Sequence, residues 1–142
     1  MIFDFYRGLS TILASGNITT YPALCAKVTA SFSVLSDTIN AVKDSLEQKH
    51  NRKDITKVIA NLQKAEGEKL NLTAALHLEQ LRLSNSKLEG MISKSSSEDG
   101  GDDRTMRLLN DGIQTLKHKI SGVVERINEE LEELRCIAAD EE

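Results

Sequence analysis

The sequence predicts an all-α protein in which four helices, two of short to medium length and two long, form an elongated bundle or coiled coil. Aromatic residues make up 4% of the chain and there is one proline, whereas strand-rich folds depend on aromatic side chains and on Pro/Gly turns. Leu, Ala, Glu, Lys and Gln all suit helices, because they lose little rotamer freedom there. Apolar residues also recur at steps of three and four along four segments.

The first two helices are expected from about Ile2 to Ala14 and from about Pro22 to Gln48. Gly16 suits the position after the first helix, and the fixed φ of Pro22 suits the first turn of the second. The first helix should pack on the second and not on a membrane, because its polar face carries little basic charge. Apolar residues of the second helix at steps of four and three predict one continuous face: Leu24, Val28, Phe32, Leu35, Ile39, Val42 and Leu46.

A basic turn follows the second helix. It has two interpretations, a contact for DNA phosphates or a solvated loop whose cations favour the end of a helix, and the second is preferred. Its residues surround Asn51 and are Lys49, His50, Arg52 and Lys53.

The third helix is expected to begin with Asp54 as N-cap and to run to about Ile92, a length of ~60 Å at ~1.5 Å per residue. Gly67 lies inside it and costs about 1 kcal/mol relative to alanine, so it is expected to mark a close helix crossing or a bend. Residues 93–104 are rich in Ser, Gly and Asp and predict a flexible linker. Ser97, before two acidic residues, fits either a kinase site or a plain linker, and phosphorylation of Ser95–Ser97 stays open.

The last helix is expected from about Thr105 to Ala139. Its apolar residues keep a heptad spacing through Met106, Leu109, Ile113, Leu116, Ile120, Val123 and Ile127. Leu131, Leu134 and Ala138 then continue the pattern after a shift that resembles a stutter. Such a face requires a partner, which is either the third helix folded back or another chain. The predicted partner face is Met106, Leu109, Ile113, Leu116 and Ile120.

The residue types that carry chemistry are scattered along the chain. His50, His77 and His118 have no second ligand at metal spacing, and Cys25 and Cys136 are expected to be buried thiols. No catalytic residue, metal, cofactor or enzymatic activity is therefore expected. Residues 1–94 carry a net charge of +3 and residues 95–142 one of −7, which argues against autonomous nucleic-acid binding. With neither a signal peptide nor a membrane span expected, the chain should reside in the nucleus and/or the cytoplasm.

A more specific pattern lies in the second and third helices. Thr29, Phe32, Ser36 and Ile39 have the spacing T-x-x-F-x-x-x-S-x-x-I. A second block is Ile59, Leu62, Gln63, Glu66, Lys69, Leu70, Leu72, Thr73 and Ala74. Over roughly residues 3–90 this resembles the required-for-excision B family, small helical proteins linked to DNA excision repair. The resemblance implies a role in repair, without a defined enzymatic step or catalytic residues.

These observations predict a helical body over residues 1–92, the linker over 93–104 and an acidic, heptad-bearing helix over 105–142. Within the body, Phe32, Ile39, Leu62 and Leu70 are expected to be buried. Polar positions such as Ser36, Gln63 and Thr73 are expected to fix helix register, or else to form a docking surface. The leading hypothesis is an accessory or scaffold protein of excision repair that acts through protein contacts, with self-association possible. The alternatives are a coiled-coil subunit of a cytoplasmic, cytoskeletal or ciliary assembly and direct DNA binding.

Overall fold

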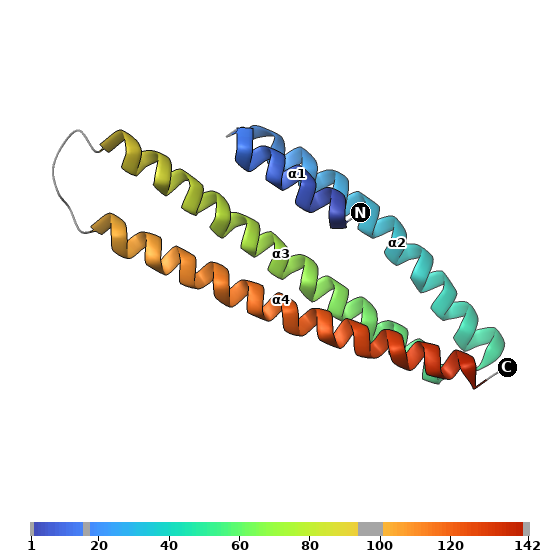
Figure 1. The fold of residues 1–142 in the computed structure, drawn as a ribbon. Helices are drawn as coiled ribbons and strands as arrows, with labels where there is room; N and C mark the ends of the chain where they lie inside the picture. Colours follow the sequence, from blue (N-terminus) through green and yellow to red (C-terminus); the bar gives the residue numbers. More distant parts are fainter. Residues whose placement is uncertain (1, 16–17, 94–100, 141–142) are drawn as a thin grey trace. The chain divides into compact units, whose positions relative to one another are not determined.

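The computed structural model describes residues 2–15, 18–93 and 101–140, and every regular element in these ranges is helical (Figure 1). The elements are α1 (Ile2–Ser15), the 3-10 turn η1 (Ile18–Thr20), α2 (Tyr21–His50), α3 (Lys53–Ser93) and α4 (Gly101–Ala139). The predicted all-α fold with four helices is confirmed. Gly16 and Ser95–Ser97, about which the sequence made specific predictions, lie outside the described residues.

The chain divides into two compact units, each made of helical segments. The first unit combines Met1–Lys64 with Asn128–Glu142, and the second is Ala65–Ile127. The first unit therefore contains α1, α2 and one end each of α3 and α4. The second consists of the remaining parts of α3 and α4.

In the first unit, α1 packs on the first half of α2, as the sequence predicts (Figure 1). Leu9 and Ile12 of α1 are buried, and so is Val28 of α2. Gly8 permits a close approach, because a Cβ atom placed there would lie 2.8 Å from both methyl carbons of Leu24. This glycine therefore sets how near the two helix backbones come.

The turn between α2 and α3 is closed by Asn51. Its backbone is left-handed, with φ 51° and ψ 30°, a conformation that asparagine tolerates better than most residues. The backbone N–H of Arg52 donates to the carbonyl oxygen of Leu46 at 3.0 Å, which satisfies an acceptor at the end of α2. The chain consequently leaves α2 after His50 and enters α3 at Lys53, one residue before the predicted N-cap Asp54.

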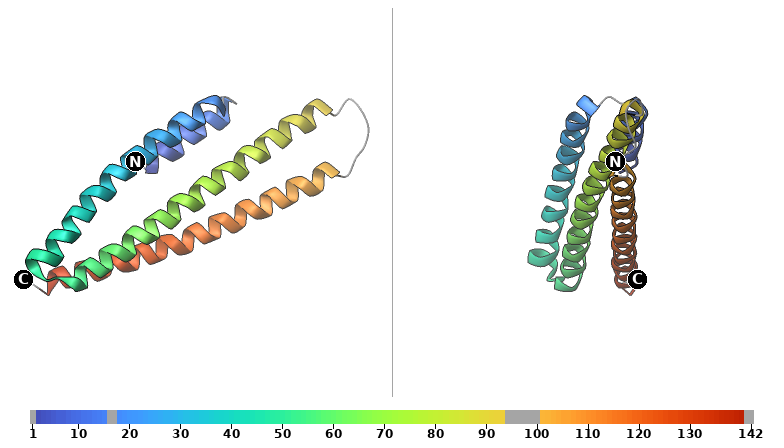
Figure 2. Two further views of the ribbon diagram at one scale, coloured as in Figure 1. Left: turned by 180° about the vertical axis from the view of Figure 1, so that it is seen from behind. Right: turned by 90° about the vertical axis from the view of Figure 1, so that its left-hand side faces the viewer.

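The second unit is a helical hairpin in which α3 and α4 run side by side in opposite directions (Figure 2). Glu68 of α3 and Arg126 of α4 form an ion pair at 2.6 Å. Both side chains are about half exposed, so this pair marks the register of the hairpin more than it stabilises it. The buried side chains come from both helices: Ala65, Thr73, Leu76, His77, Leu81, Ile113, Val123 and Ile127.

Two details of the long helices differ from the expectations. Helix α4 begins at Gly101, four residues before the expected start at about Thr105. Asp103 pairs with Arg107 one turn later, and an acidic residue near a helix N-terminus is favoured by the helix dipole. A Cβ atom at Gly67 would meet nothing within 4 Å, so this glycine does not mark a close crossing. The other expectation for Gly67, a bend in the helix, stays a prediction.

The predicted stutter in α4 is also absent. After Ile127 the half-buried side chains are Glu130, Leu134 and Ile137, which continue the steps of three and four without a shift. Leu131 is 36% exposed, and Ala138 is exposed as well. An uninterrupted heptad period needs no local change in helix winding, so α4 keeps its register and places a glutamate at an otherwise apolar position.

Candidate interaction surfaces

The apolar face predicted along α2 is covered over only part of its length. Val28 is buried, and Leu24 lies against α1. Farther along the helix, Leu35 is 44% exposed and Val42 is 49% exposed. The first half of this face is therefore part of the core. In the second half Leu35 and Val42 are exposed, whereas Ile39 and Leu46 are half-buried.

The four residues that the sequence expected to be buried in the body are half-buried instead. Phe32 and Ile39 lie on α2, and Leu62 and Leu70 lie on α3. A chain of this size has few helices to surround any one side chain, so many apolar residues are covered on one side only. The expectation of full burial is wrong for all four.

Gln63 joins α2 to α3 through two side-chain hydrogen bonds. The ammonium group of Lys43 donates to its Oε1 at 3.1 Å, and its own Nε2 donates to Oδ1 of Asn40 at 3.2 Å. An amide that donates and accepts at the same time fits only one alignment of the two helices. This supports the register interpretation for Gln63, whereas Ser36 lies exposed on α2.

Four polar residues lie along one face of α3 at steps of three and four, and burial increases along them. Lys69 pairs with Glu66 at 2.6 Å, and its side chain is 16% exposed. Thr73 is buried, and His77 has no exposed surface at all. Burial lowers the pKa of His77 to about 4, so the imidazole is neutral near pH 7.

The sequence did not predict the burial of His77, which was considered as a metal ligand and lacks a second ligand at metal spacing. The available signal was its spacing, four residues after Thr73 and eleven after Glu66, which places the three on one face. The centre of this buried face is thus polar. Such a face needs well-aligned neighbours, and that requirement favours one packing arrangement over others.

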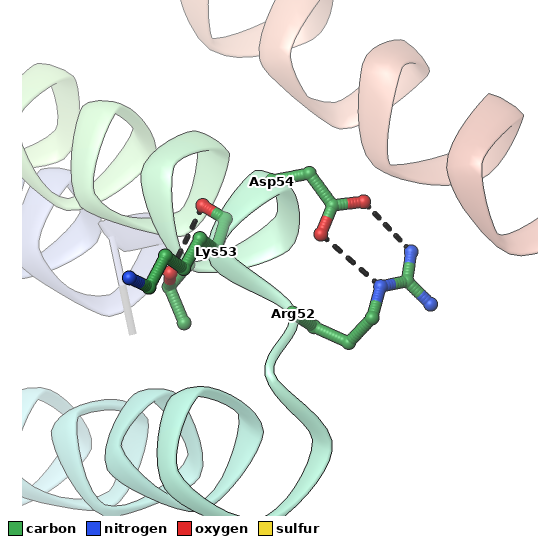
Figure 3. Close-up of polar contacts among 4 residues, drawn as sticks. Arg52, Lys53 and Asp54 are labelled. Atoms are coloured by element: carbon green, nitrogen blue, oxygen red, sulfur yellow. Dashed lines mark hydrogen bonds and ion pairs between the residues drawn. The ribbon is translucent and has the colours of Figure 1, made fainter.

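The basic turn is partly neutralised by its own neighbour (Figure 3). Arg52 donates to both carboxylate oxygens of Asp54, from Nε at 3.1 Å and from Nη2 at 2.8 Å. These bonds, together with one from the backbone N–H of Ile55, hold the pKa of Asp54 at about 2. Thr56 adds a bond from its hydroxyl to the carbonyl oxygen of Lys53 at 3.1 Å. Because the charge of Arg52 is already paired, these contacts favour the solvated turn over a phosphate site.

The predicted partner face of α4 lies within the helical hairpin. Ile113 is buried, and the other members are half-buried: Met106, Leu109, Leu116 and Ile120. The face continues through Val123 and Ile127, which are 2% and 6% exposed. A partner would have to displace α3 to reach the buried members. That this face binds another chain stays a prediction.

The two cysteines are free, and they differ in exposure. Cys25 is half-buried, but Cys136 is exposed, so the prediction that both are buried is wrong for Cys136. Tyr21 lies one turn before Cys25. The pKa of the Tyr21 phenol is raised, mainly by burial and to a smaller extent by a hydrogen bond with the Cys25 thiol.

Among the described residues, no three His, Cys, Asp or Glu side chains gather where they would hold a metal ion. None of the described helices combines the length and the apolar character that a membrane crossing demands.

These features define a small helical protein whose distinctive polar residues either bond to neighbouring side chains, as Gln63 and Lys69 do, or are buried, as Thr73 and His77 are. The family model described as DNA repair REX1-B matches residues 2–80, and the chain belongs to this family. The match includes α1, α2 and most of α3, with Gln63, Lys69, Thr73 and His77, and it ends before α4. Comparison with curated proteins and with solved structures gave no match.

Proposed function

We propose that the protein is an accessory or scaffold protein of DNA excision repair, without enzymatic activity, that acts in the nucleus and/or the cytoplasm through contacts with other proteins. The observation that carries this proposal is the family match, which spans residues 2–80 and is described by its role in DNA repair. The matched segment contains the exposed apolar residues Leu35 and Val42 of α2, and this supports a role in binding.

The state of the polar residues supports contacts over catalysis. A general acid or base must come within hydrogen-bond reach of its substrate, whereas His77 has no exposed surface. Gln63 and Lys69 are used in bonds to neighbouring side chains. Gln63 and Lys69 are therefore already engaged within the protein, and His77 is out of reach of a substrate.

The experiment that tests the repair role is survival after ultraviolet irradiation of cells that lack the protein. We expect deletion to lower survival, and the intact gene to restore it. Ionising radiation is the matched control, because strand breaks are repaired by a different chemistry, and sensitivity should there be close to normal. Normal survival after ultraviolet light, with stoichiometric co-purification of other helical chains, would favour the structural coiled-coil alternative.

Direct DNA binding is expected to be weak. The C-terminal part of the chain carries a net −7, and Arg52 in the basic turn is already paired with Asp54. Fluorescence anisotropy with labelled single- and double-stranded oligonucleotides near 150 mM salt, roughly the physiological range, tests this expectation. Salt-sensitive binding at about 1 μM or tighter would show that the protein contacts DNA itself.

A further inference from the structure

One row of residues on α2, four of them apolar, passes from a covered region into an open one. The row keeps steps of four and three through six residues: Leu24, Val28, Ser31, Leu35, Thr38 and Val42. Its first three members are buried or half-buried, and its last three are exposed. The change falls between Ser31 and Leu35, within a single turn of the helix.

The length of α1 explains where the row becomes open. Helix α1 has 14 residues and α2 has 30, and both rise by ~1.5 Å per residue. Because α1 folds back along α2 from the short η1 turn, it reaches only about the first half of its partner (Figure 1). The side of α2 that α1 occupies near Leu24 therefore continues past α1 as an uncovered surface.

The open half of the row presents apolar groups. Leu35 and Val42 are 44% and 49% exposed, and Val34 beside them is 67% exposed. Thr38 lies between them, and its hydroxyl donates to the carbonyl oxygen of Val34 at 3.0 Å. That bond turns the hydroxyl toward the helix backbone, so Thr38 adds its methyl group to the surface. We name Val34, Leu35, Thr38 and Val42 the α2 patch.

The charges on the side of α2 that carries the patch indicate what fits it. Lys27 and Lys49 are both exposed and lie eleven residues to either side of Thr38, about three helical turns away. Both lysines consequently lie on the side of the helix that carries the patch. Asp37 and Asp44 are exposed as well, but at ~100° per residue they project about 100° or more away from Thr38. If two copies paired through this surface, a lysine would face a lysine at each end, whether the helices ran parallel or antiparallel. Such pairing opposes self-association and favours a partner with acidic residues at both ends.

We propose that the α2 patch is a docking surface for an amphipathic helix of another protein, with apolar residues at heptad spacing and acidic residues toward its two ends. The bound helix continues along α2 from the place where α1 stops, and its acidic ends meet Lys27 and Lys49. This inference deepens the proposed function and rests on it for the expectation that the chain acts through protein contacts.

The probe is a fluorescent helical peptide of about 22 residues, the span from Lys27 to Lys49, with leucine at heptad positions and glutamate at both ends. A second peptide carries lysine in place of each glutamate. With the full chain, anisotropy should show at least about tenfold tighter binding of the acidic peptide. Leu35→Asp with Val42→Asp should weaken that binding by about tenfold or more. Leu108→Asp, at a 64% exposed leucine of α4, is the matched control and should bind as the unchanged protein does.

A second variant keeps the test independent of the apolar substitutions. Lys27→Glu with Lys49→Glu, both at exposed positions, should reverse the preference between the two peptides. Equal binding of both peptides by the unchanged protein, or unchanged binding by the Leu35/Val42 variant, would overturn the proposal. Light scattering tests whether the occupant is a second copy of this chain. If the mass of the unchanged protein doubles as its concentration rises, and the Leu35/Val42 variant stays a monomer, the proposal is also overturned. Survival after ultraviolet light does not depend on these outcomes, so the proposed function and this inference fail separately.

Discussion

Helices α2 and α4 carry apolar residues with the same heptad period, but neighbouring helices cover these two apolar faces to different extents. In α4, Ile113, Val123 and Ile127 are at most 6% exposed, whereas Leu35 and Val42 of α2 are 44% and 49% exposed. The reason is the length of the neighbouring helix. In the hairpin, residues 65–93 of α3 lie along residues 101–127 of α4, two segments of nearly equal length. Beside α2, the 14 residues of α1 cover about half of a 30-residue helix.

This comparison shows that having an apolar face and having that face covered are two separate properties of a helix. The period shows that a helix has an apolar face, but it does not show how far that face is covered. From the sequence, α4 was predicted to be the element that requires a partner, and α2 was predicted to be part of the core. In the structure the more open apolar face belongs to α2.

The largest expected effect comes from placing charges in both faces. Ile113→Asp with Ile120→Asp should lower the free energy of unfolding by roughly 5 kcal/mol or more, because unpaired carboxylates would be buried in the hairpin. Leu35→Asp with Val42→Asp should change it by less than about 1 kcal/mol, because these side chains already contact water. Urea unfolding followed by circular dichroism measures both. Equal losses in the two variants would contradict the difference between the helices.

Truncating single side chains should give a graded series. Ile127→Ala, at a position that is 6% exposed, should cost roughly 2–5 kcal/mol, and Val42→Ala about 0.5 kcal/mol or less. Phe32→Ala should fall between them, below the range for a fully buried aromatic residue, because Phe32 is half-buried. Chemical denaturation of the three variants tests this order. A larger loss at Val42 than at Ile127 would show that the covered face has been misassigned.

Acid should weaken the hairpin through His77. Its pKa is about 4 in the folded chain and 6.5 in the unfolded one, so between these values the unfolded state binds more protons. The contribution of His77 is complete above about pH 6.5, decreases as the pH falls, and amounts to about 3 kcal/mol lost near pH 4. The pH dependence of the urea midpoint measures it.

Removing the imidazole of His77 tests this prediction. His77→Leu should flatten the dependence between pH 4 and 6.5, because the group whose pKa differs between the folded and unfolded states is then absent. Asp54, whose pKa is held at about 2, loses its contribution only as the pH falls below its ordinary value of 3.8. It therefore titrates outside this window. An identical profile for the His77 variant and the unchanged protein would show that His77 is hydrated.

The smallest effects are expected at glycines. Gly67→Ala should stabilise the protein by up to about 1 kcal/mol, because the position is helical and a Cβ atom there meets nothing within 4 Å. Gly8→Ala gains the same helix propensity but brings its methyl group to 2.8 Å from Leu24, so the gain should be offset. Thermal unfolding of the two variants measures the difference. Equal stabilisation by both would mean that α1 does not approach α2 closely.

The helices themselves were predictable because their signals are local. Pro22 lies in the first turn of α2, Asn51 ends that helix, and the period of the apolar residues gives the extent of α3 and α4 within a few residues. The register of α4 after Ile127 was not predictable in the same way, because Leu131 fits an apolar pattern better than Glu130 does. Packing decided it, since a continuous helix keeps its heptad period even where that places a glutamate on the covered face.

Some features of the candidate surfaces were likewise predictable from the sequence, and others were not. The motif residues Gln63 and Lys69 were identified from spacing, and the structure shows what they bond to. The burial of His77 and the exposure of Val42 were not identified, because both depend on which neighbours reach a given turn of the helix. A histidine and a valine at helical spacing give the same local signal in either environment. The exposure of a side chain thus depends on which helix packs beside it and cannot be read from the spacing of apolar residues alone.

Hydroxyl-radical footprinting of the purified monomer, read by mass spectrometry, tests the central claim most directly, because it compares the two faces without any substitution. The structure predicts rapid oxidation at Leu35 and Val42, and at least about tenfold slower oxidation at Ile113, Val123 and Ile127, because radicals reach only side chains that contact water. Comparable oxidation at the α4 positions, or protection of Leu35 and Val42 in the monomer, would contradict the account.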